Sequence, residues 1–210
     1  MSFIIFSFAL ASSFLISTFA IDLKLKNFNE MLIGFSLSFF GLGVVIASLI
    51  HNIIREKFNL YFTLVSSIII QLLFILLIFF QFKILTIVII TFILGITNHI
   101  NFLTIETYIS SNFKKKSGFY ISLFWSSAGL GAILGSLIIA INGVNLLSYY
   151  IALILVTFQF IPVLIAKLNV IHVKIEIVKF SLSFKVIKNI RFILLCVFLL
   201  GISDAGWSSL

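Results

Sequence analysis

Charged residues, proline and cysteine are scarce in this sequence. Only 10% of its 210 residues are charged, whereas 62% are hydrophobic. A water-soluble domain needs more polar surface than this to cover its core, so the lipid bilayer must be the solvent for most of the chain. The one cysteine, Cys196, cannot form an intrachain disulfide and has no partner at metal-ligand spacing, which favours a core thiol. We expect no metal site and no cofactor.

Motifs for hydrolytic, redox or ATP-driven chemistry are also lacking. The sequence has no glycine-rich phosphate loop followed by Lys and Ser or Thr, which excludes an ATP-driven pump. It has no Ser-His-Asp set and no paired His or Cys ligands at usable spacing. We therefore do not expect an enzyme.

Long apolar runs dominate the sequence instead. A helix that rises about 1.5 Å per residue needs roughly 20 residues to cross the hydrocarbon layer. The runs do not alternate as the strands of a membrane barrel do, so we predict an all-α, polytopic membrane protein. The first run lacks a basic segment before it and a convincing cleavage site, which indicates a retained helix and not a signal peptide. Seven spans are predicted, at 2–21, 31–54, 60–80, 84–109, 119–141, 146–166 and 192–210.

The basic residues predict the orientation of these spans. Of the 14 Lys and Arg residues, all except Lys24, Lys26 and Lys83 follow an even-numbered span or precede the seventh. Cationic loops stay in the cytoplasm, so the N-terminus is predicted to be cytoplasmic, in a membrane of the bacterial inner type. The net charge of +8 is spread over short loops and forms no single face, so nucleic acid is not an expected partner.

A basic stretch at 167–191 separates the sixth span from the seventh. Its apolar residues and partial alternation favour either a strand or an interfacial segment on anionic headgroups. We interpret it as a cytoplasmic linker between a six-helix bundle at 1–166 and a second bundle that begins with the helix at 192–210. One helix has no bundle to pack into, so we expect a truncated or split form, whose partner is a separate C-terminal half or a second copy.

Small residues indicate where helices approach each other closely. Gly41 in the second span, and Gly131 and Gly135 in the fifth, are candidates for helix packing, because helices in lipid associate through tight contacts between small residues. Static packing is one interpretation, and a smooth face along which helices slide is the other.

The loop after the second span carries a recognisable pattern. In the stretch 52–59, Glu56 stands for an acidic residue, Lys57 for a basic one and Asn59 for a turn glycine, since Asn tolerates positive φ. Asn52 replaces the first glycine of the pattern, and residues 60–61 replace its closing basic pair.

Two further segments complete the pattern. They are the basic loop 112–118, which ends in Gly118, and the glycine-spaced stretch 129–135, which lacks a Gly-Pro pair. In this order the chain resembles the N-terminal half of a major facilitator superfamily transporter. The resemblance implies secondary active transport of a small solute by alternating access, coupled to protons or ions, with residues 56, 57 and 59 at a cytoplasmic gate. A non-transporting scaffold or receptor-like subunit is the alternative.

Polar residues gather in the fourth predicted span. Asn98, His99, Asn101 and Glu106 lie in an otherwise apolar stretch, and ionisable groups at membrane depth are functional candidates. His99 and Glu106 are two helical turns apart and share a face. The functional hypothesis is that His99 or Glu106 exchanges a coupling proton while Asn98 contacts the solute. The structural one is that these groups only bond neighbouring helices, and for Glu106 we expect pairing with Lys57 or Lys114.

Other polar or aromatic residues are weaker candidates. Gln71 and Gln159 are expected to bridge helices, and Trp125 either lines a cavity or packs. Asp204 is a candidate only within a complete second bundle, and Asp22 is expected to be a solvated helix end.

Overall fold

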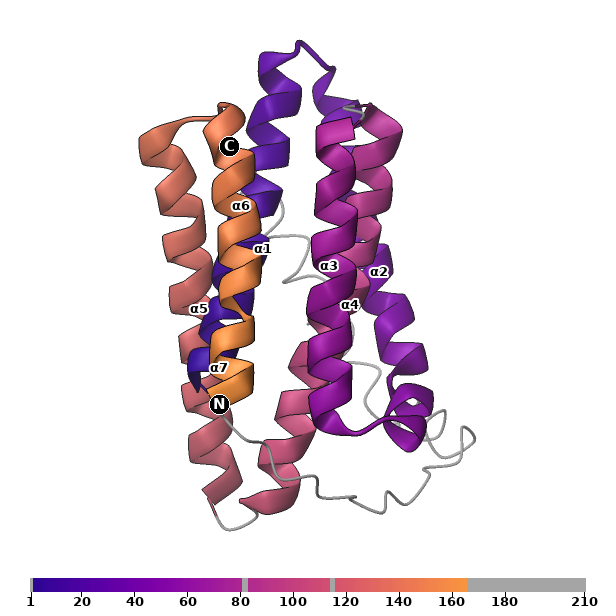
Figure 1. The fold of residues 1–210 in the computed structure, drawn as a ribbon, viewed down its shortest axis with the longest axis vertical. Coiled ribbons are helices and arrows are strands. Elements are labelled where there is room, and N and C mark those ends of the chain that lie inside the picture. Colours follow the sequence, from indigo (N-terminus) through magenta and orange to yellow (C-terminus); the bar gives the residue numbers. More distant parts are fainter. Residues whose placement is uncertain (1, 81–82, 114–115, 166–210) are drawn as a thin grey trace, which may run out of the picture. The chain divides into compact units, whose positions relative to one another are not determined.

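A computed structural model describes residues 2–80, 83–113 and 116–165, and within these ranges the chain is entirely helical apart from short connections (Figure 1). The predicted linker 167–191, the predicted span 192–210, Asp204 and Cys196 lie outside the described residues. The elements are α1 (Ser2–Leu25), α2 (Glu30–Lys57), α3 (Leu60–Phe80), α4 (Ile84–Asn112), α5 (Ser117–Asn142), α6 (Leu146–Phe158) and α7 (Phe160–Ile165).

Six stretches of these helices are long and apolar enough to cross a membrane, the last of them made of α6 and α7 together. For the described residues, this confirms the predicted all-helical class, with helices that suit a bilayer. The first helix continues one turn past the predicted end at residue 21, so the connection to α2 is much shorter than residues 22–30. Asn27 turns the chain there with a φ of 58°, and the Asn29 side chain caps α2 by accepting a bond from the Met31 N–H at 3.0 Å.

The sixth span is interrupted at Gln159. Pro162 has no N–H, so the carbonyl of Phe158 loses the donor that a continuous helix would provide four residues later. The N–H of Gln159 instead bonds the Val156 carbonyl at 3.1 Å, a tighter turn than an α-helix makes. The break therefore separates α6 from α7 within a single apolar stretch.

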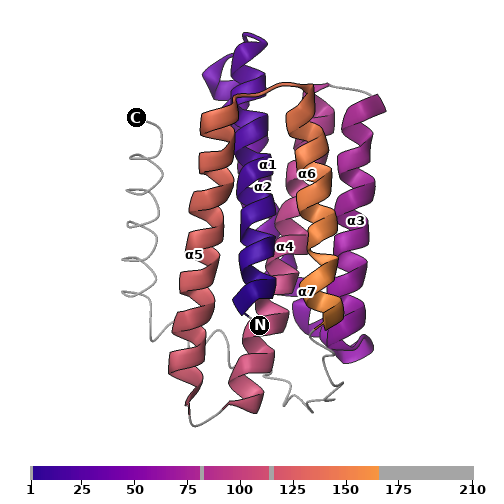
Figure 2. The same ribbon diagram turned by 60° about the vertical axis from the view of Figure 1, so that its left-hand side comes forward.

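The six membrane-length stretches pack as two groups of three. In the first, α1 lies along α5 and also contacts α6; in the second, α4 lies along α2 and also contacts α3 (Figures 1 and 2). Contacts between α3 and α6, and smaller ones of α1 with α2 and α4 and of α4 with α5, join the groups. The buried core includes Phe8, Phe14 and Phe19 of α1 and Phe124 of α5.

Glycines allow the closest approach within each group. A Cβ on Gly131 or Gly135 of α5 would fall within 3.0 Å of the α1 backbone. On the other side, Gly43 of α2 and Gly95 of α4 lie against each other's helix in the same way. Gly41 does not pack as expected: a Cβ there would meet no described atom within 4 Å, because it lies on the opposite side of α2 from Gly43.

Candidate functional site

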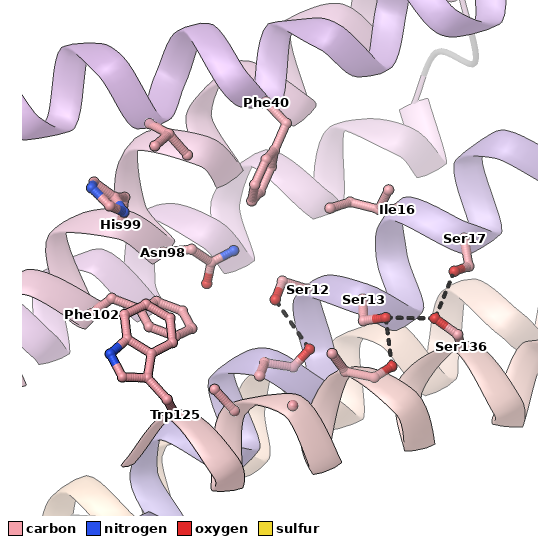
Figure 3. A pocket seen from close by; sticks show the side chains of 15 residues that line it. Ser12, Ser13, Ile16, Ser17, Phe40, Asn98, His99, Phe102, Trp125 and Ser136 are labelled. Atoms are coloured by element: carbon pink, nitrogen blue, oxygen red, sulfur yellow. Dashed lines mark hydrogen bonds between the residues drawn. The ribbon is translucent and has the colours of Figure 1, made fainter. Parts of the chain in front are cut away.

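A cavity of about 610 Å³ lies between the two groups of helices, bounded by α1, α2, α4 and α5 (Figure 3). Its volume falls in the range of small-molecule sites, roughly 300–1,000 Å³. The residues that line it lie near the middle of these helices, at a depth where polar groups are costly and need a reason. Among the described residues, the lining contains no Asp, Glu, Lys or Arg, and His99 is its one titratable side chain.

One wall of the cavity is aromatic. Phe102 of α4 and Trp125 of α5 stack with ring centroids 5.8 Å apart and planes inclined by 23°. Phe40 of α2 lines the same space (Figure 3). Trp125 is half exposed, so this pair presents a flat apolar surface and does not bury it in the core.

The facing wall carries hydroxyl groups. Ser12, Ser13 and Ser17 come from α1, and Ser136 comes from α5 (Figure 3). The hydroxyls of Ser13 and Ser136 are 2.7 Å apart, and Ser17 donates to Ser136 at 3.3 Å. Ser13 also reaches the carbonyl of Ala132 at 2.7 Å, so a chain of hydroxyls joins α1 to α5 beside the glycine contacts.

Asn98 of α4 lies between these walls with an oriented amide. It is 2% exposed, and its Oδ1 accepts a bond from Gln71 Nε2 of α3 at 3.2 Å. Gln71 also donates to Thr97 Oγ1 at 3.0 Å, which fixes the glutamine amide in turn. The Nδ2 of Asn98 is buried and has no partner among the described residues. It points into the cavity in Figure 3.

His99 also lines the cavity, partly exposed and without a hydrogen bond among the described residues. Asn101 does not line it: this fully buried side chain faces α3, where Ser67 bonds its Oδ1 at 2.5 Å and its Nδ2 has no described partner. One turn further along α4, the Thr104 hydroxyl lies 3.3 Å from Nε2 of the buried His51 of α2, within hydrogen-bond distance. A row of polar groups thus follows α4 from the cavity toward the end where Asn112 lies.

Glu106 stands apart from this arrangement. It does not line the cavity, and the ion pairs among the described residues are those of Lys24 with Glu30 and Lys26 with Asp22. The expected pairing of Glu106 with Lys57 is therefore absent, and Lys114 lies outside the described residues.

Among the expected gate residues, Asn59 does not have the backbone conformation that was predicted for it. Within the described ranges Asn27 is the one non-glycine residue with positive φ, so Asn59 does not replace a turn glycine. Its Oδ1 instead accepts a bond from the Phe62 N–H at 2.7 Å and caps α3. Glu56 and Lys57 are exposed in the last turn of α2.

Two further expectations were wrong. Asp22 is not a solvated helix end: it is 8% exposed, accepts a bond from the Tyr149 hydroxyl of α6 at 2.5 Å, and pairs with Lys26 at 3.0 Å. Gln159 does not bridge helices among the described residues, since both polar atoms of its fully buried amide lack a partner there.

The structure brings Asn98, His99 and Trp125 to one cavity and places Gln71 directly behind it. Sequence reasoning missed the serine wall. The spacing of Ser13 and Ser17 by four residues puts both on one face of a helix, which was the available signal. The described residues contain no group of three His, Cys, Asp or Glu side chains that could hold a metal ion.

Comparison with known proteins returned no match: no family model matches the chain, and no curated protein or solved structure matches it significantly.

Proposed function

We propose that this chain forms one bundle of a secondary active transporter of the major facilitator type, which moves a small solute by alternating access. The observation that carries the proposal is the cavity between the two groups of helices. It is large enough for a solute, lies at mid-membrane depth, and combines an oriented amide, a titratable imidazole and an aromatic surface.

The pairing of the helices supports the same proposal. The contacts are symmetric if α1, α2 and α3 are taken to correspond to α4, α5 and α6. Under this correspondence the α1–α5 pair becomes the α4–α2 pair, and the α3–α4 pair becomes the α6–α1 pair, and all four pairs are in contact. Corresponding helices, such as α1 and α4, run in opposite directions, because one is an odd and the other an even span (Figure 1). Inverted repeats of this kind are common in secondary transporters, whose sites lie at the interface between repeats.

In the proposed mechanism, His99 binds and releases the coupling proton and Asn98 contacts the solute. Imidazole titrates near neutral pH, so it can change charge under physiological gradients. The free-energy cost of a charged imidazolium at this depth is tolerable only while water fills the cavity, so protonation is linked to opening. In this proposal a second bundle faces the half-exposed Trp125 and completes the passage.

Alternating access can be tested before the solute is known. Ser136 is replaced by Cys in a Cys196→Ala background, and a membrane-impermeant thiol reagent is applied to vesicles of each orientation. A transporter exposes this cavity residue to each side in turn, so labelling from both sides is expected. Lys57→Cys and Lys83→Cys, at opposite ends of the bundle, serve as one-sided controls. A scaffold would show labelling of residue 136 from one side only or from neither, and either result would refute the proposal.

A further inference from the structure

The cavity offers a hydrogen-bond donor on one side. Asn98 has its Oδ1 bonded by Gln71 at 3.2 Å, so the amide cannot turn without losing that bond. Its Nδ2 is left pointing into the cavity with no partner among the described residues (Figure 3). A buried donor without an acceptor is costly, and a bound molecule that supplies the acceptor removes this cost.

The serine wall offers acceptors. Each hydroxyl has one proton, and short contacts assign all of them within the wall. Ser12 donates to the Phe8 carbonyl at 2.8 Å, and Ser13 to the Ala132 carbonyl at 2.7 Å. That leaves Ser136 as the donor to Ser13, and Ser17 as the donor to Ser136. The lone pairs of Ser12 and Ser17 remain, so a ligand on this side has to donate.

The remaining surface selects against charge and favours a ring. Phe102 and Trp125 stack to form a flat face beside Asn98. None of the described residues that line the cavity is Asp, Glu, Lys or Arg, so an ion placed there would lose its hydration without gaining a counter-charge from them. Neutral His99 compensates neither sign of charge.

From these three surfaces we infer that the cavity binds an uncharged, ring-bearing solute that carries both a hydrogen-bond acceptor, for Asn98 Nδ2, and a hydroxyl or N–H donor, for Ser12 and Ser17. This ligand class is the substrate class of the transporter proposed above. Binding of such a solute follows from the cavity alone, and its transport rests on the proposed function. While His99 is neutral, zwitterions and fully ionised solutes are disfavoured, because their charges would lack a partner among the described residues of the lining.

Fluorescence quenching of Trp125 tests this directly. The 210-residue chain has two tryptophans, so Trp207→Phe leaves Trp125 as its only indole. Four nitroaromatic quenchers share one ring and differ at one substituent: 4-nitrobenzyl alcohol, 4-nitrotoluene, 4-nitrobenzoate and 4-nitrobenzyltrimethylammonium, whose charge does not depend on pH. The assay is run at about pH 8, where an ordinary imidazole is neutral, and concentrations are corrected for partition into the detergent.

Saturable quenching by the alcohol is expected, with half-saturation at about a tenfold lower concentration than for nitrotoluene, which keeps the nitro group but lacks the hydroxyl that can donate to Ser12 and Ser17. The two ions should bind at least about tenfold more weakly than the alcohol. If either ion saturates the signal at a lower concentration than the alcohol, or if the alcohol and nitrotoluene are equivalent, the inference is wrong.

Variants locate the binding. Asn98→Leu should weaken alcohol binding about tenfold, and Asn142→Leu, which removes an exposed amide outside the cavity, should leave it unchanged. Asn98→Asp keeps the shape and the bond from Gln71 but adds a negative charge, so its preference should shift to the ammonium compound. An unchanged order of binding in Asn98→Asp would overturn the inference. Quenching as expected without two-sided labelling of residue 136 would refute transport while leaving the ligand class standing.

Discussion

Gln71 on α3 donates a hydrogen bond to Asn98 on α4 at 3.2 Å, and both side chains are almost fully buried, at 1% and 2% exposure. Gln71 does not line the cavity, yet it determines which end of the Asn98 amide faces that space. A buried glutamine between two helices therefore has two effects at once. It joins α3 to α4, and it orients the donor with which the cavity meets a solute.

Gln71→Leu should lower stability by about 1–2 kcal/mol, since two bonds between helices are lost and the oxygen of Asn98 is left without its donor. The measurement is the unfolding midpoint in a denaturing-detergent titration. Asn142→Leu is the matched control, because that amide is exposed and bonds only within its own helix. Equal midpoints for the two variants would show that the bond from Gln71 contributes nothing.

Paired glycine substitutions should separate the helix contacts from the open faces. Gly43→Leu should prevent folding, because a Cβ there falls within 3.0 Å of the α4 backbone, whereas Gly41→Leu should be tolerated. On α5, Gly131→Leu should fail while Gly129→Leu, two residues away, should fold with a smaller cavity. Yield and monodispersity by size-exclusion chromatography give the readout. A well-folded Gly131→Leu protein would contradict the packing of α1 on α5.

The sequence predicted the helical class and the membrane-spanning lengths because apolar runs of bilayer length have few other solutions. Helix ends were less predictable. Asn59 illustrates why: an asparagine after a helix suits either a positive-φ turn or the cap of the next helix, and the sequence does not distinguish them. Likewise, the sixth span was predicted as one uninterrupted stretch at 146–166. The break before Pro162 was missed, and its position depends on how the preceding turn tightens.

The candidate site was predictable only in part. Asn98 and His99 are conspicuous because polar groups are rare in spans, whereas serines are common there and bond their own helix, so the serine wall carried little signal. The partners of a buried polar group depend on which helices meet. Asp22 therefore looked like a solvated end until α6 placed Tyr149 against it.

The bond between Asp22 and Tyr149 gives a further prediction. Tyr149→Phe should destabilise the protein by about 1–3 kcal/mol, because the buried carboxylate loses a donor while the ring itself is kept. Tyr150→Phe is the control on the adjacent residue, which is 48% exposed. Thermal unfolding of the two purified variants is compared. If Tyr149→Phe is as stable as Tyr150→Phe, Asp22 does not depend on this donor.

Charge asymmetry predicts the orientation in the membrane. Residue 57 should be cytoplasmic and residue 83 external, following the basic loops after the even-numbered spans. In a Cys196→Ala background, an impermeant thiol reagent added to intact cells should label Lys83→Cys and not Lys57→Cys. The reverse pattern would invert the predicted topology, although the packing of the helices would be unaffected.

His99 should couple opening of the cavity to pH. When the imidazole is protonated, a closed and dry cavity would bury an uncompensated charge, so acid should favour the hydrated, open form. The thiolate is the form that reacts and its fraction falls with pH, so the labelling rate of Ser136→Cys is divided at each pH by that of the exposed Lys83→Cys. This ratio should rise severalfold as the pH falls from about 8 to 5, the range in which histidine titrates. His99→Gln should remove this dependence while the protein stays folded. His51→Gln should retain it, since His51 is buried against Thr104 and does not line the cavity. A pH dependence that persists in His99→Gln would assign the proton to another group and refute this part of the mechanism.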